Sequence, residues 1–140
     1  MANTQTLAAL ITVARPIHWV KNVALFAALV FTGNLNQPEL LIKVFWAFIA
    51  FNLATSATYI VNDIFDIKLD RLHPIKKNRP LAAGTIPVPL ALLEAIGLIF
   101  FALILAKSLN PLFFLAVFGY ILMQAFYSLG LKNLAIVDIL

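Results

Sequence analysis

Four long apolar stretches, separated by short polar segments, make up most of the chain. They cover residues 16–33, 40–66, 88–105 and 112–129. Each is close to the roughly 20 residues that an α-helix needs to cross a bilayer. The pattern therefore predicts an all-α, polytopic bundle of about four membrane-spanning helices in a single transmembrane domain over residues 1–140. Asp138 is expected to open a fifth span.

Composition supports this interpretation. The 140 residues are 63% hydrophobic and 11% charged, whereas soluble domains carry about 25% charged residues. The chain has no cysteine, which excludes disulfides and thiolate metal sites. The formal net charge of +4 comes mostly from one loop. This pattern favours anionic lipid headgroups or an anionic substrate as partners, and it argues against nucleic acid.

Polar residues in the second apolar stretch are not scattered. Asn52, Thr55, Ser56 and Tyr59 recur at helical spacing and lead toward Asn62, within about 120° of arc. A polar stripe in a membrane helix normally faces the bundle interior or a wet cavity. We interpret it as the lining of a reaction chamber. The alternative is that its small residues serve tight helix packing.

The stripe ends in three aspartates. Asp63, Asp66 and Asp70 fall within about 60° of arc if the helix continues to about Arg71. Three carboxylates on one face repel each other unless cations bind there. Hard oxygen ligands at this spacing suit Mg²⁺, which usually also contacts substrate phosphates.

A basic loop follows the aspartates. Pro74 is expected to end the helix, leaving Lys76, Lys77 and Arg79 free to fold back over the carboxylates. Carboxylates for a metal and cations for phosphate oxygens are what a diphosphate leaving group requires. The alternative is that the aspartates pair with neighbouring cations at a solvated helix end, and that the loop is only a positive-inside signal.

The segment Asn62-Asp63-x-x-Asp66-x-x-x-Asp70 resembles the first aspartate-rich motif of the UbiA prenyltransferase superfamily. The continuation through His73-Pro74-Ile-Lys76-Lys-Asn-Arg79-Pro80 is most similar to the decaprenyl-phosphate phosphoribosyltransferase branch. So are Arg15-Pro16-Ile-His-Trp19-Val-Lys21-Asn22 and Tyr127-Ser128-Leu-Gly-Leu131-Lys132. The resemblance runs from about Arg15 to the last residue. It implies metal binding and catalysis by the three aspartates, with Asn62, Lys76 and Arg79 at the substrate.

The resemblance also singles out residues outside the motif. Lys21, Asn22, Tyr127 and Lys132 become candidate substrate contacts. Without the resemblance, the basic ones would be explained by headgroup anchoring or the positive-inside rule. Tyr127 shares a face with Tyr120 and Gln124 in the fourth span, and we expect that face to meet the polar stripe. Anchoring of Tyr127 in the aromatic belt is the alternative.

The resemblance implies a transferase that uses a diphosphate donor, Mg²⁺ and a polyprenyl lipid in the membrane. The first candidate reaction moves a phosphoribosyl group from phosphoribosyl diphosphate to a polyprenyl phosphate. The alternatives are prenyl transfer from a polyprenyl diphosphate to a lipophilic acceptor, and a non-catalytic membrane fragment or assembly partner.

The sequence also leads to expectations about completeness and orientation. Superfamily members have about nine helices and a second aspartate-rich motif, so this sequence is expected to be the N-terminal half, prone to self-association when alone. The positive-inside rule places the N-terminus and the site on the cytoplasmic side of a bacterial or archaeal plasma membrane.

Overall fold

The computed structural model describes residues 4–131, and they form helices without any strand. The first half contains α1 (Thr4–Ala14), the 3-10 helix η1 (Pro16–Phe26), α2 (Ala27–Phe31) and α3 (Pro38–Phe65). The second half contains α4 (Ile67–Leu72), η2 (Lys76–Asn78), α5 (Pro80–Ala83), α6 (Val88–Leu109), α7 (Pro111–Phe126) and the π-helical turn η3 (Tyr127–Leu131). The all-α prediction is confirmed.

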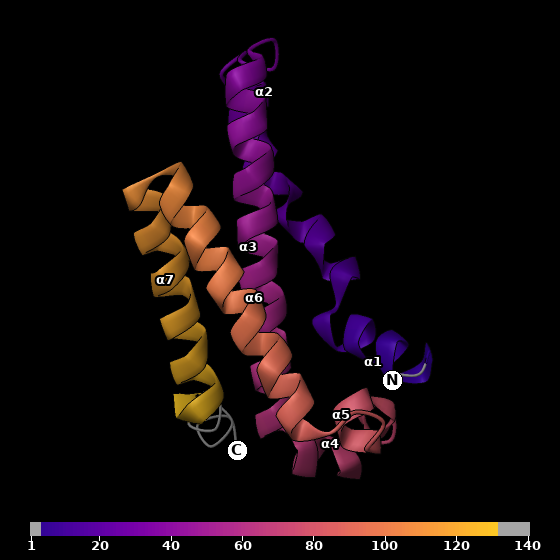
Figure 1. Ribbon diagram of the computed structural model, residues 1–140. Helices are drawn as coiled ribbons and strands as arrows, with labels where there is room; N and C mark the ends of the chain where they lie inside the picture. The colour runs from indigo at the N-terminus through magenta and orange to yellow at the C-terminus, as the bar shows by residue number, and fades with distance from the viewer. Residues whose placement is uncertain (1–3, 132–140) are drawn as a thin grey trace.

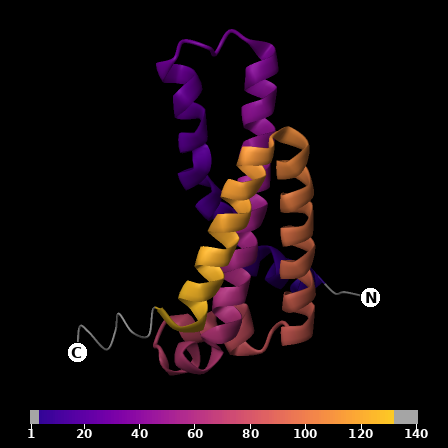
Figure 2. The ribbon, with the colours of Figure 1, turned by 90° about the vertical axis from the view of Figure 1, so that its left-hand side faces the viewer.

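The long helix α3 is the axis of the bundle (Figure 1). It packs most extensively against α6, and α6 in turn packs against α7. On its other side α3 contacts η1, which leads up to α2 and the turn into α3 (Figure 2). The short elements α4, η2 and α5 gather at the lower end of the bundle in both views.

Three helices are long and apolar enough to cross a membrane: Pro38–Phe65, Val88–Leu109 and Pro111–Gly130. They correspond to the second, third and fourth predicted spans. The predicted first span, 16–33, is not one α-helix, because residues 16–26 form a 3-10 helix and only residues 27–31 are α-helical. At rises of about 2.0 and 1.5 Å per residue, the two pieces together reach about 30 Å. This length matches the hydrocarbon core of a bilayer, at about 30 Å.

Small residues let α3 approach α6 closely. Ala50 and Ala54 of α3 and Ala102 and Ala106 of α6 are completely buried in one cluster. Close backbone approach through small side chains is the usual basis of helix packing in membranes, where hydrophobicity alone does not drive association.

The polar stripe of α3 faces η1 instead. Trp19 Nε1 donates to Ser56 Oγ at 2.8 Å, and Asn22 Nδ2 donates to Asn52 Oδ1 at 2.6 Å. Ser56 and Asn52 are almost completely buried. The upper part of the stripe is therefore a sealed seam between two helices, and the expectation that it lines an open chamber is wrong there.

The seam explains why η1 is a 3-10 helix. Asn22 comes three positions after Trp19, and Ser56 comes four positions after Asn52. A three-residue step in a 3-10 helix and a four-residue step in an α-helix both advance by about 6 Å. The 3-10 form therefore keeps successive polar pairs opposite one another, and the seam places the N-terminal end of η1 beside the aspartates.

Candidate functional site

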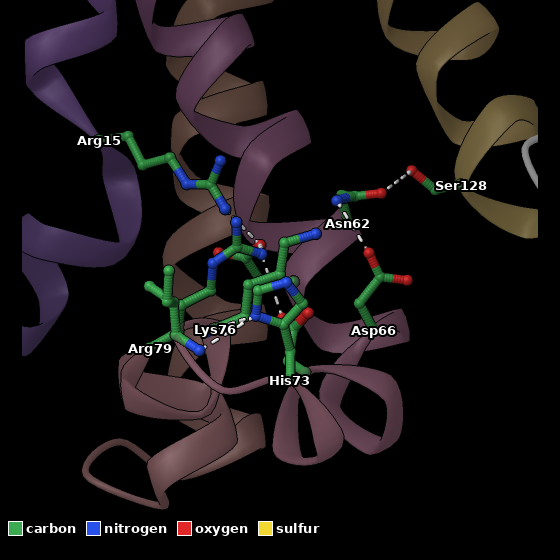
Figure 3. A network of polar contacts seen from close by, with 10 residues as sticks. Arg15, Asn62, Asp66, His73, Lys76, Arg79 and Ser128 are labelled. Atoms are coloured by element: carbon green, nitrogen blue, oxygen red, sulfur yellow. Dashed lines mark hydrogen bonds and ion pairs between the residues drawn. The ribbon is translucent and has the colours of Figure 1, made fainter.

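The three aspartates do not lie on one continuous helix. α3 ends at Phe65, and Asp66 has φ −93° and ψ 5° before α4 begins. Backbone bonds from Asp66 N to Asn62 O at 3.0 Å and from Asp70 N to Asp66 O at 2.8 Å carry the chain across this break. The break separates Asp66 from the two arginines of the site (Figure 3).

Asp63, Arg79 and Asp70 form a chain of ion pairs with Arg15. Asp63 Oδ1 lies 2.5 Å from Arg15 Nη2 and 3.4 Å from Arg79 Nη1, and Arg79 Nη1 lies 3.1 Å from Asp70 Oδ2. Both carboxylates are buried, with Asp63 only 2% exposed. Buried charges of this kind need close partners. The chain thus ties the start of η1, the end of α3 and the basic loop together.

Local hydrogen bonds fold the basic loop back as predicted. His73 Nδ1 accepts from the backbone N–H groups of Ile75 and Lys76, at 3.1 Å each. Arg71 Nε donates to the carbonyl of Ala82 at 2.9 Å, which fastens α4 to α5. Arg79 lies just before Pro80, the first residue of α5, and this turn directs its side chain to the aspartates (Figure 3).

Asp66 belongs to a second polar group. Asn62 Nδ2 donates to Asp66 Oδ2 at 3.2 Å, and Ser128 Oγ donates to Asn62 Oδ1 at 3.4 Å. Ser128 comes from the π-helical turn η3, so this group joins α3 to the end of α7 (Figure 3).

A cleft of about 410 Å³, lined by both polar and apolar residues, opens beside the ion pairs. Its lining includes Thr12, Arg15, His18, Asp63, Asn78 and Arg79. Guanidinium, imidazole and amide groups of this kind bind phosphate oxygens well, the guanidiniums in bidentate fashion.

The oxygen donors suit a hard cation in kind but not in arrangement. Two of the three carboxylates are bound to arginines. Among the residues that the structure describes, no three His, Cys, Asp or Glu side chains are close enough to hold one metal ion together. In this conformation the aspartates therefore do not form a three-carboxylate metal centre.

The other candidate residues are distributed unevenly. Lys76 is exposed at the site, and Lys21 is exposed on η1. Asn22 lies in the seam, where it donates to Asn52 Oδ1. Tyr127 is 48% exposed in η3. Lys132 and Asp138 lie outside the described residues.

Two residues at the site are missing from the set predicted from the sequence. Arg15 stands in the segment that resembles the phosphoribosyltransferase branch, but nothing in that segment predicts its ion pair with Asp63. Ser128, 5% exposed, takes the inward position that was expected for Tyr127. A π-helical turn adds about one residue per turn, so the inward face at the end of α7 shifts by about one position. The sequence pattern did not predict this turn.

Residues 7–140 match the sequence model of the UbiA prenyltransferase family. This match covers far more than half of the chain. The chain belongs to the UbiA prenyltransferase family. With three helices able to span a membrane, this UbiA chain is an integral membrane protein.

Similar UbiA proteins include decaprenyl-phosphate phosphoribosyltransferases. The protein of that name from Mycobacterium tuberculosis (strain CDC 1551 / Oshkosh) is 42% identical over 95% of this chain and 45% of its own length. The one from Mycolicibacterium smegmatis is 37% identical over 93% and 42%. The digeranylgeranylglyceryl phosphate synthase of Sulfurisphaera tokodaii is 31% identical over 84% and 43%. The chain thus spans about half the length of the relatives it matches.

Proposed function

We propose that this chain is the donor-binding part of a Mg²⁺-dependent transferase that moves a phosphoribosyl group from phosphoribosyl diphosphate to a polyprenyl phosphate. The observation that carries the proposal is the cleft beside Asp63, where two arginines from separate elements meet buried carboxylates. It offers cationic groups for a diphosphate next to oxygen ligands for a cation. The three aspartates are the proposed catalytic and metal-binding residues.

The reaction breaks the bond between the ribose carbon and the diphosphate and forms a bond from that carbon to an acceptor phosphate oxygen. Positive charge develops on the carbon, and negative charge develops on the departing diphosphate. Arg79, Lys76 and Lys132 are the proposed partners of those phosphate oxygens. The acceptor phosphate is already ionised, so no side chain has to remove a proton from it.

The choice of donor rests on the relatives. Proteins named as phosphoribosyltransferases are 42% and 37% identical to the chain. A digeranylgeranylglyceryl phosphate synthase is 31% identical, which keeps prenyl transfer as the second candidate. A non-catalytic membrane fragment is the candidate from another class. In all three cases we place the aspartate site on the cytoplasmic side, because the basic loop lies at that end.

The test is Mg²⁺-dependent binding of phosphoribosyl diphosphate and of geranylgeranyl diphosphate to the chain in detergent. We expect the sugar diphosphate to bind, and Asp66→Asn to weaken binding by at least about tenfold. The matched control is Glu39→Gln, which removes one negative charge in the first turn of α3, far from the site. Binding of the prenyl diphosphate alone would favour the second candidate. Binding of neither would reject donor binding by this chain.

A further inference from the structure

The position of Arg15 conflicts with a metal site at Asp63. Arg15 Nη2 lies 2.5 Å from Asp63 Oδ1, and the side chain of Asp63 is only 3% exposed. A short, charge-assisted contact to a buried carboxylate is among the stronger hydrogen bonds in proteins. A cation that approached Asp63 would meet a guanidinium already bound there.

The backbone of Arg15 is unusual as well. Its φ of 52° and ψ of 57° place its backbone in the left-handed region. Residues other than glycine adopt this conformation only at a cost in free energy. Pro16 follows and disfavours the right-handed helical region for the residue before it. Arg15 is therefore fixed at the junction of α1 and η1, and its contacts with α3 hold it in a strained conformation.

The guanidinium of Arg15 also has contacts other than Asp63. Its guanidinium carbon lies 4.7 Å from the centre of the Tyr59 ring, a cation–π contact that would persist if Asp63 were taken. The Tyr59 ring is supported by His18 at 5.3 Å between ring centres. The cleft of about 410 Å³ adjoins both Arg15 and His18, and its lining also includes Asn78. The guanidinium could thus leave the carboxylate for this open cleft, where polar groups as well as apolar ones surround it.

We propose that Arg15 is a counter-ion that competes with a divalent cation for Asp63. The inference rests on the proposed metal-binding role of the aspartates and adds the residue that controls access to them. With Arg15 in place, the buried carboxylate is neutralised without metal. When a divalent cation takes Asp63, the guanidinium leaves the carboxylate, keeps its contact with the Tyr59 ring and turns into the cleft. Arg15 therefore lowers the affinity for a cation that arrives without an anionic partner.

The test measures Mn²⁺ alone, by the electron paramagnetic resonance signal of the free ion, with the chain in detergent and no donor. We expect Arg15→Gln to bind Mn²⁺ about tenfold more tightly than the unchanged chain. Arg15→Lys keeps the charge but not the forked geometry, and it should fall between the two. The matched control is Arg71→Gln, which removes the same charge from a guanidinium bound to the Ala82 carbonyl. It should leave Mn²⁺ affinity nearly unchanged.

Unchanged or weaker Mn²⁺ binding in Arg15→Gln overturns the proposal, as does an equal gain in Arg71→Gln or no Mn²⁺ binding in any variant. If Arg15→Gln loses its helical circular dichroism, the Mn²⁺ affinity of Arg15→Lys is used in its place. An affinity equal to that of the unchanged chain then counts against the proposal. Failure of this proposal and failure of the proposed function can be distinguished. Tighter Mn²⁺ binding in a chain that binds no phosphoribosyl diphosphate would support the counter-ion role and reject the proposed donor.

Discussion

Burial separates the roles of the aspartates at the scale of single residues. Asp63 and Asp70 are 2% and 4% exposed, and both lie against arginine. Asp66 is partly exposed and contacts Asn62. Removing one partner of a buried ion pair leaves an uncompensated charge, whereas partly solvated groups are shielded by water. The same substitution should therefore have different consequences at neighbouring positions.

We expect Asp63→Asn to lower the free energy of unfolding by about 3–5 kcal/mol, because it leaves Arg15 and Arg79 without their shared carboxylate. Asp66→Asn should cost less than about 1 kcal/mol. Both are measured by denaturant unfolding in detergent, followed by circular dichroism. Equal losses for the two variants would contradict the assignment of Asp63 as the buried centre of the ion pairs.

Which residues gather at the candidate site could be predicted from the sequence in part, but which side chains pair with one another could not. The spacing of Asp63, Asp66 and Asp70 and the return of the loop to them were predictable from charge and from Pro74. The pairing of Asp63 with Arg15 was not, because the two residues are 48 positions apart. The pairing depends on the length of η1, because an α-helix over the same residues would be shorter than the 3-10 helix. The break at Asp66 had no signal from proline or glycine.

At the scale of elements, the seam between η1 and α3 is held by polar pairs in a largely apolar bundle. Asn22 Nδ2 donates to Asn52 Oδ1 and lies 3.4 Å from Thr55 Oγ1. Asn52 is completely buried, and its Nδ2 has no hydrogen-bond partner among the described residues. Losing Asn22 would leave a second polar atom of Asn52 unpaired, which is more costly than removing both residues.

We expect Asn22→Leu to destabilise the chain by about 1–3 kcal/mol. The double variant Asn22→Leu with Asn52→Leu should cost less than the sum of the two single changes, since it leaves no orphaned amide. Thermal unfolding in the same detergent is measured for the unchanged chain, the two single variants and the double variant. Val20→Leu is the control, because Val20 is 71% exposed on η1. Additive effects would show that the amide pair does not hold the seam.

The element boundaries show where pattern reasoning works. The second, third and fourth predicted spans correspond to α3, α6 and α7 because long apolar stretches with proline at the start leave few alternatives. The first predicted span, 16–33, is a 3-10 helix followed by a short α-helix and not one α-helix. Hydropathy records which residues avoid water, and it does not record the rise per residue.

For the whole molecule, basic charge is concentrated at one end of the bundle. The elements α4, η2 and α5 carry the basic loop and lie together at the lower end of the bundle (Figure 1). The opposite end has the uncharged turn between α2 and α3, where Asn34 bonds to Thr32 and Gln37. By the positive-inside rule, this asymmetry supports the proposed orientation, with the loop on the cytoplasmic side.

Cysteine labelling tests that orientation, since the chain has no cysteine of its own. We expect Asn34→Cys to react with a membrane-impermeant maleimide in intact cells. Lys77→Cys should react only after the membrane is permeabilised. The reverse pattern would place the aspartate site outside and would be incompatible with the proposed orientation. Labelling of both in detergent shows that each thiol is accessible.

The 3-10 form of η1 has a further consequence for how its sequence encodes structure. Side chains three apart are eclipsed in such a helix, so Pro16–Phe26 sorts into three straight columns. Trp19 and Asn22 form the column against α3. Ile17, Val20 and Val23 form another, 79%, 71% and 50% exposed. Phe26, the last residue of this second column, lies instead against Phe48 of α3. From Ile17 to Val23, a residue therefore shares its surroundings with the residues three positions away, and a substitution there is interpreted by its column and not by its depth in the membrane.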